Sequence, residues 1–249
     1  MRITAVETVP YRIPMRKPLA FASGAVDHIE HVLLRLHTDE GLTGCADIPP
    51  RPYTYGETLA SVIAVIDGVF AEALLGADPL DRAGIHAHLR RTVGNQTAKG
   101  GIDVALWDLI GQAAGVSVHR LLGGYCESLA VTHMLGFAPT EAVVDEALAF
   151  IDTHGVRSFK IKVGRRPVGV DVDLVTALRE AVGPDVLLYL DANRGWTATE
   201  AAQMLAATPG ADLRFFEEPD DAAEVLGRRR LVASSPIPIV ADEPAPDLG

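Results

Sequence analysis

Two patterns of hydrophobic and polar residues divide the chain at about residue 128. In the first part, loosely alternating residues predict strands, and Asp39-Glu40-Gly41 predicts the turn of a hairpin between the second and third of them. These strands are expected at residues 2–14, 31–38 and 42–48. Apolar residues at helical spacing then predict helices near 57–75, 81–92, 98–114 and 117–122, the last ending at Gly123-Gly124. A meander followed by helices is an α+β pattern.

From about Leu129 onward the sequence predicts strict alternation of strands and helices. The expected strands are 129–135, 159–163, 186–191, 213–217 and 237–242. The expected helices are 140–153, 170–182, 197–207 and 220–233. Thr140 with Glu141, and Thr197 with Glu200, supply signals for the start of two of these helices.

The strands of this second part are apolar at nearly every residue, which is typical of a parallel sheet covered by helices. Their repeat of roughly 25–29 residues suits a (β/α) barrel, in which catalytic groups come from the carboxyl ends of the strands. The competing architecture is a doubly wound open sheet, but the Gly-rich loop that such a sheet carries does not follow 129–135. We predict domains at 1–125 and 126–249.

Composition narrows the class of protein. The formal net charge of −11 argues against nucleic-acid binding, and 48% hydrophobic residues in a chain of 249 allow a substantial core. No N-terminal signal segment and no apolar run of about 18 residues is present, which argues against a membrane protein. Cys45 and Cys126 resemble neither a metal clip nor a disulfide framework. We expect a cytoplasmic protein that handles small molecules.

Three of the predicted strands end in acidic residues spaced about 25 residues apart, namely Asp191, Glu217 and Asp242. One such acid alone is an ordinary helix cap or loop residue. Three carboxylates at equivalent strand ends repel one another unless a cation neutralises them. Three protein carboxylates that leave coordination positions for substrate and water favour Mg²⁺ over Ca²⁺. Glu218 and Glu243 follow two of these acids, and because side chains alternate along a strand only one of each pair points inward.

Lys160 and Lys162 share one face of their predicted strand by the same alternation. On an edge strand both would extend into solvent. Inside a barrel they would face one pocket, where repulsion and burial would lower their pKa and let one act as a base near neutral pH. A lysine base beside a metal-bound carboxylate indicates removal of the proton α to that carboxylate.

These residues together resemble the enolase superfamily, and within it the muconate-lactonizing (cycloisomerase) subgroup, of the mandelate racemase/muconate lactonizing enzyme type. The matching motifs lie in this order along the chain: Ile102 to Leu109, Arg120 to Gly124, Lys160-Ile161-Lys162, Asp191-Ala192-Asn193, Glu217-Glu218-Pro219 and Ala241-Asp242-Glu243. The resemblance implies an α+β N-terminal capping domain followed by a (β/α)₇β barrel of the TIM type.

The resemblance also implies roles for single residues. Asp191, Glu217 and Asp242 would bind one Mg²⁺, with Mn²⁺ as a possible substitute, and Asn193 would support that site. Lys162 would be the base, with Lys160 beside it tuning its pKa. Loops expected at 16–27 and 49–56 would close over the substrate, so that specificity candidates are Phe21, Arg51, Tyr53 and Tyr55. His133 is a further candidate for substrate contact, although a structural role is the stronger expectation.

The implied function is a cycloisomerase, racemase or epimerase acting on a small carboxylate, as a homo-oligomer in its full-length form. A dehydratase or an o-succinylbenzoate synthase of the same superfamily would use the same chemistry. From another class, the chain would be an inactive fragment that serves only as an interaction module.

One departure from the family pattern concerns length. A complete barrel takes about 250 residues, whereas the sequence ends just after the fifth predicted strand. The lysine that the family carries on the opposite face of the substrate, on the sixth strand, has no counterpart. We therefore expect a partial barrel of five strands, truncated relative to the family, and expect the 249-residue chain alone to be inactive or poorly stable.

Overall fold

The computed structural model describes residues 1–21, 24–52, 54–221, 223–242 and 245. The chain divides into two compact units. The first comprises Met1–Arg16 and His28–Ser128, and the second comprises Lys17–Asp27 and Leu129–Gly249. The second unit thus includes a segment, 17–27, that the sequence analysis places in the first domain.

A three-stranded sheet in the order β1-β2-β3 lies mostly in the first unit, and the adjoining ends of β1 and β2 belong to the segment 17–27 of the second. Its strands are β1 (Ile3–Phe21), β2 (Gly24–Thr38) and β3 (Thr43–Ile48). β2 and β3 pair antiparallel from Val32 opposite Ile48 to His37 opposite Thr43, which confirms the predicted hairpin. Alternate residues of β2 are fully buried, namely Val32, Leu34 and Leu36. One face of this sheet therefore forms a core, as the alternation predicts.

The predicted loop at 16–27 is wrong over most of its length, because β1 continues to Phe21 and β2 begins at Gly24. Pro18 and Gly24 favour a loop at 16–27, and β1 also contains Pro10 and Pro14. β1 is an edge strand, and an edge strand tolerates proline where the missing N–H would point away from its partner. The three prolines are spaced by four residues, so these positions all face the same side of the strand.

The helices of the first unit follow the predicted order. They are α1 (Leu59–Val65), the π-helical turn η1 (Ile66–Phe70), α2 (Ala71–Leu74), α3 (Arg82–Leu89), α4 (Gln96–Ala114) and α5 (Val118–Leu121). α4 packs directly on β3, and two glycines permit the close approach. A Cβ on Gly44 would lie 2.3 Å from the Ala105 carbonyl oxygen, and one on Gly101 would lie 2.3 Å from Ile48 Cγ1.

The second unit contains a parallel five-stranded sheet whose spatial order, β4-β5-β6-β7-β8, follows the chain. Its strands are β4 (His133–Leu135), β5 (Ser158–Lys162), β6 (Leu187–Asp191), β7 (Leu213–Glu217) and β8 (Ile239–Val240). The helices are α6 (Thr140–His154), α7 (Gly169–Val182), α8 (Ala198–Ala207), the short 3₁₀ turn η2 (Pro209–Ala211) and α9 (Val225–Ser234).

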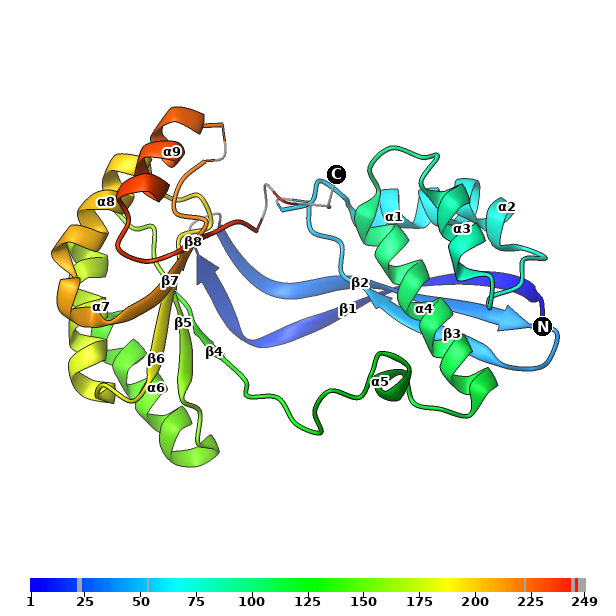
Figure 1. The fold of residues 1–249 in the computed structure, drawn as a ribbon, viewed down its shortest axis with the longest axis horizontal. Helices are drawn as coiled ribbons and strands as arrows, with labels where there is room; N and C mark the ends of the chain where they lie inside the picture. Colours follow the sequence, from blue (N-terminus) through cyan, green and yellow to red (C-terminus); the bar gives the residue numbers. More distant parts are fainter. Residues whose placement is uncertain (22–23, 53, 222, 243–244, 246–249) are drawn as a thin grey trace. The chain divides into compact units, whose positions relative to one another are not determined.

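Helices α6, α7 and α8 lie along one side of this sheet (Figure 1). A doubly wound sheet reverses its strand order at a switch point and carries helices on both faces. The sequential strand order and the one-sided helices show that the doubly wound alternative is wrong for this sheet.

Two predicted strands of this unit are shorter in the structure. Residues 129–132 are not in a strand, and Leu129 and Val131 are largely exposed, so β4 keeps only its last three residues. The segment predicted at 237–242 forms a strand only at Ile239–Val240. Helix α6 begins at Thr140 as predicted, but Thr140 does not cap it, because Pro139 is the N-cap residue and makes no side-chain cap bond. Thr197 and Glu200 form the expected capping box.

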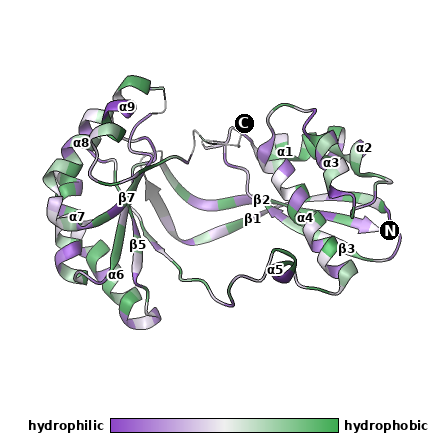
Figure 2. Ribbon diagram, in the orientation of Figure 1, coloured by the Kyte–Doolittle hydropathy of each residue, from purple (hydrophilic) through white to green (hydrophobic). Residues whose placement is uncertain are grey.

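The core of the second unit lies between the sheet and its helices. Phe159, Ile161, Leu188, Leu190 and Phe216 are completely buried in it. Each such side chain contributes about 1.5–3 kcal/mol by leaving water. Helices α6 to α8 carry both hydrophobic and hydrophilic residues, as expected of helices with one covered side (Figure 2). Within the described part of the chain, no helix has the length and apolarity needed to cross a membrane.

Candidate active site

The register of the parallel sheet brings the predicted site residues into line at the ends of β5, β6 and β7. Lys162 lies opposite Asp191, and Asp191 lies opposite Glu217. Glu217 in turn lies opposite Val240, two residues before Asp242. Because paired residues of parallel strands present their side chains on the same face, these groups point away from the apolar core on the helix side.

Four of the predicted site residues have side chains that form a connected group. We call this group the lysine cluster; it consists of Lys160, Lys162, Asp191 and Glu217. Lys162 Nζ lies 2.5 Å from Asp191 Oδ2 and donates to Asn193 Oδ1 at 2.5 Å. Lys160 Nζ donates to Glu217 Oε1 at 2.7 Å and lies 2.9 Å from Asp191 Oδ2. The Asp191 carboxylate also accepts from the Asn193 backbone N–H at 2.9 Å. Asp191 thus joins both lysines.

The lysine cluster shifts the ionisation of its members. Burial raises the pKa of Glu217, and the carboxylates of Asp191 and Asp242 raise it further, against the hydrogen bond from Lys160. Burial by itself lowers the pKa of Lys160, but hydrogen bonds to Glu217 and Asp191 outweigh it and hold the pKa above its ordinary value. The prediction of a lowered pKa is therefore wrong for Lys160, because its nearest charges are carboxylates rather than Lys162.

Asp242 lies in the turn after β8 and is half-buried. Its carboxylate is close enough to Glu217 to raise the pKa of that side chain. Among the residues that the structure describes, no three His, Cys, Asp or Glu side chains stand in an arrangement that could hold a metal ion. The assignment of Asp191, Glu217 and Asp242 as metal ligands therefore stays a prediction.

The residues predicted to choose the substrate are only partly described. The Phe21 side chain and Tyr53 lie outside the described residues. Arg51 and Tyr55 are exposed in the 49–56 segment, where the Arg51 carbonyl accepts from the backbone N–H groups of Thr54, Tyr55 and Gly56. Their role in specificity stays a prediction.

His133 takes the structural role that the sequence analysis favoured. It lies opposite Phe159 on the helix side of the sheet, away from Lys160. Its Nε2 lies 2.9 Å from Glu146 Oε1, and its ring stacks on Phe150 with centroids 3.6 Å apart.

A second group of charged residues, which sequence reasoning missed, lies beside the lysine cluster. We call it the arginine cluster: Arg228 of α9 with Glu218 and Asp220, whose carboxylates are completely buried. Arg228 donates from Nη2 to Glu218 Oε2 and from Nε to Asp220 Oδ1, each at 3.1 Å. Nothing in the run Arg228-Arg229-Arg230 shows which arginine is paired. Only the adjacency of Glu218 to Glu217 hinted at a distinct role.

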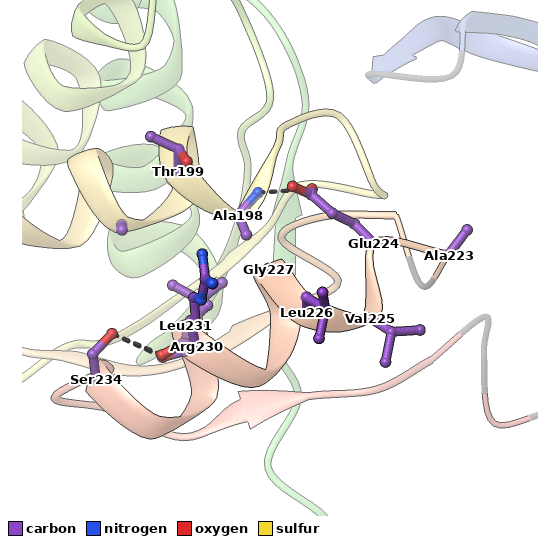
Figure 3. A pocket seen from close by; sticks show the side chains of 11 residues that line it. Ala198, Thr199, Ala223, Glu224, Val225, Leu226, Gly227, Arg230, Leu231 and Ser234 are labelled. Carbon is purple, nitrogen blue, oxygen red and sulfur yellow. Dashed lines mark hydrogen bonds between the residues drawn. The ribbon is translucent and has the colours of Figure 1, made fainter.

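A hollow of about 580 Å³ lies between α8 and α9 (Figure 3). It is lined by small and apolar residues such as Ala198, Val225 and Leu226, together with Glu224, which accepts from the Ala198 backbone N–H at 3.1 Å. None of the predicted site residues lines it. The hollow therefore belongs to the outer, helical surface and is not the candidate active site.

Two family descriptions match successive parts of the chain. Residues 3–123 match "Mandelate racemase / muconate lactonizing enzyme, N-terminal domain", and residues 142–248 match "Enolase C-terminal domain-like". Among curated proteins, the chain is 30% identical to an N-succinyl-L-Arg/Lys racemase of Bacillus cereus over 98% of this chain and 66% of that protein. The chain is also 30% identical to muconate cycloisomerase 1 of Rhodococcus opacus, over 98% of this chain and 66% of that protein.

Solved structures give the same picture. A muconate lactonizing enzyme from "Mucobacterium Smegmatis", complexed with muconolactone, is 48% identical with a TM-score of 0.96 and covers 98% of this chain and 67% of its own. A dipeptide epimerase from Enterococcus faecalis V583, complexed with Mg and the dipeptide L-Leu-L-Tyr, is 30% identical with a TM-score of 0.93, covering 98% and 69%. The chain thus spans about two thirds of the length of these relatives.

Proposed function

Because this chain belongs to the mandelate racemase/muconate lactonizing enzyme family of the enolase superfamily, we propose that its lysine cluster serves a Mg²⁺-dependent isomerase. The reaction is removal of the proton α to a substrate carboxylate, followed by return of a proton or closure of a ring. We also propose that the five parallel strands are the first five of a (β/α) barrel. The observation that carries the function is the contact of two lysines with two strand-end carboxylates on one face of the sheet.

The donor set suits a hard divalent cation. Asp191, Glu217 and Asp242 offer only carboxylate oxygens, which Mg²⁺ prefers and Mn²⁺ also accepts. Burial raises the pKa of Glu217, and the nearby carboxylates of Asp191 and Asp242 raise it further, so a cation bound there would relieve their repulsion. A bound Mg²⁺ would supply the positive charge that stabilises a substrate carboxylate as its α proton leaves.

The residues of the chain would handle the proton. Lys162 Nζ takes the α proton: the C–H bond breaks, an N–H bond forms, and the electron pair moves toward the substrate carboxylate. The contacts with Asp191 Oδ2 and Asn193 Oδ1 fix the position of Nζ. Lys160 lies on the same face of β5 and is joined to Lys162 through the Asp191 carboxylate.

The substrate class follows the relatives, which include muconate cycloisomerases, dipeptide epimerases and an N-succinyl amino acid racemase. We propose a small organic carboxylate as the substrate. Homo-oligomer formation by the full-length protein stays a prediction.

Calorimetric titration with Mg²⁺ tests the metal site directly. The wild-type chain should bind one ion, and a variant combining Asp191→Asn, Glu217→Gln and Asp242→Asn should lose that affinity. Asp173→Asn, which changes an exposed carboxylate on α7, is the matched control and should bind as the wild type does. Equal affinity in the triple variant would defeat the proposal and favour the interaction module.

A further inference from the structure

Glu218 connects the ends of three strands at the candidate site. Its backbone N–H donates to the Val240 carbonyl at 3.1 Å, and its own carbonyl accepts from the Arg194 N–H at 2.9 Å. Its side chain reaches the turn after β8, where Oε1 accepts from the Asp242 backbone N–H at 2.6 Å. One buried residue thus links the segments that follow β6, β7 and β8.

The backbone at Glu218 is bent to make these links possible. Its φ is 40°, in the left-handed region that residues other than glycine seldom adopt. β7 ends one residue earlier, at Glu217. Alternation along the strand directs Glu217 toward Lys160 and Glu218 to the other face, and beyond the bend the Glu218 side chain accepts from the Asp242 backbone N–H. An uncommon conformation that the surroundings hold in place is a reasonable sign of function.

Arg228 fixes the Glu218 carboxylate from the opposite side. It donates to Glu218 Oε2 at 3.1 Å, and it also contacts Asp220 through Oδ1 and the backbone carbonyl. A guanidinium has a rigid, planar set of donors and stays charged at all ordinary pH values. With Oε2 held by Arg228, Oε1 remains aimed at the Asp242 N–H.

We propose that Glu218, held by Arg228, is a positioning residue that sets the place of Asp242 and thereby the third carboxylate of the metal site. The proposal rests on the proposed function. Glu218 does not contact metal or substrate in this proposal. It affects metal binding by holding the backbone of Asp242 in place. Partners that orient a metal ligand typically change metal affinity by about 10–100-fold when removed.

Two substitutions of Glu218 separate positioning from mere support of the fold. Glu218→Ala removes both acceptors, whereas Glu218→Gln keeps a carbonyl oxygen that can accept from Asp242. Glu200→Gln is the matched control, because Glu200 also accepts from a backbone N–H, that of Thr197, and from an arginine, Arg166. Mn²⁺ affinity is measured by calorimetry, and protection of the Asp242 amide is measured by hydrogen exchange in the metal-free protein.

The expected result is a loss of Mn²⁺ affinity of about 10–100-fold in Glu218→Ala, partial recovery in Glu218→Gln, and no change in Glu200→Gln. The effect of Glu218→Ala should largely disappear when Asp242→Asn is already present, since a residue that acts through Asp242 has nothing left to position. An equal effect in both backgrounds would overturn the proposal, as would wild-type affinity in Glu218→Ala.

Amide exchange separates this proposal from the proposed function. If the wild-type chain binds no Mn²⁺, the proposed function fails, and the positioning proposal is then decided by the Asp242 amide alone. Faster exchange of that amide in Glu218→Ala than in Glu218→Gln and Glu200→Gln supports it. Unchanged protection in Glu218→Ala overturns it.

Discussion

Glu217 and Glu218 are neighbours in the chain, yet their carboxylates lie in two different clusters. Glu217 faces Lys160 in the lysine cluster, where its side chain remains 13% exposed. Glu218 faces Arg228 in the arginine cluster and is completely sealed from solvent. The cation decides what each cluster can do. A lysine can lose its proton and act as a base, whereas an arginine keeps its charge and can only hold its partners.

The lysine cluster and the arginine cluster therefore have different roles at the strand ends. The side chains proposed to bind a metal ion and to take a proton lie on the face of the sheet away from the helices, where Lys160 and Glu217 are partly exposed and Asp191 is buried. Groups that hold the strand ends in place are buried beneath them. Three substitutions test this difference, and they follow in order of decreasing expected effect.

The largest expected effect comes from removing the cation of the arginine cluster. Arg228→Met leaves Glu218 and Asp220 buried without their guanidinium, and breaking a buried pair in this way costs about 3–5 kcal/mol of unfolding free energy. Urea unfolding followed by circular dichroism measures the loss. A cost below about 1 kcal/mol would place Arg228 among ordinary surface ion pairs.

The next effect concerns Glu217 and should fall on metal binding rather than stability. Glu217→Gln removes a proposed metal ligand. Loss of a residue that only orients a ligand lowers metal affinity by at most about 100-fold, so Mn²⁺ affinity should fall by more than that. Lys160 keeps its partner Asp191, 2.9 Å away, and the unfolding free energy should change by less than about 1 kcal/mol. A large loss of stability with intact affinity would reverse the roles assigned to Glu217 and Glu218.

The smallest effect tests a carboxylate outside both clusters. The Arg166 guanidinium and the Thr197 backbone N–H hold the pKa of Glu200 down at about 2. A lowered pKa contributes stability that is present above the ordinary value near 4.5 and is lost as pH falls toward 2. Glu200→Gln should therefore lower the melting temperature slightly at pH 7, and the difference should shrink as the pH falls through this window. A difference that is independent of pH would contradict the assignment.

The sequence predicts much of this arrangement because the lysine cluster follows from simple periodicities. Alternation places Lys160 and Lys162 on one face, and a regular strand spacing places Asp191 and Glu217 at neighbouring strand ends. The arginine cluster could not be predicted in the same way. Its members meet through a bend at Glu218 and a turn of α9, and neither has a period that can be recognised in the sequence.

Errors in the predicted fold have similar physical causes. Proline and glycine at 16–27 indicated a loop, but pairing of the edge strand β1 with β2 overrode that local preference. Apolar residues at 129–132 indicated a strand, yet within the described part of the chain they pair with no strand, and Leu129 and Val131 stay exposed. Local composition therefore failed where pairing with a distant segment decided the outcome.

The central claim is that two lysines and a metal ion share one site, and the chain contains only four lysines, Lys17, Lys99, Lys160 and Lys162. With lysine labelled at ¹³Cε, Mn²⁺ should broaden the Lys160 and Lys162 signals in the wild-type protein and should leave them sharp in Asp191→Asn. Lys99, which donates to the Thr92 carbonyl, serves as the reference signal for non-specific broadening. Sharp Lys160 and Lys162 signals at saturating Mn²⁺, or equal broadening in Asp191→Asn, would contradict the account.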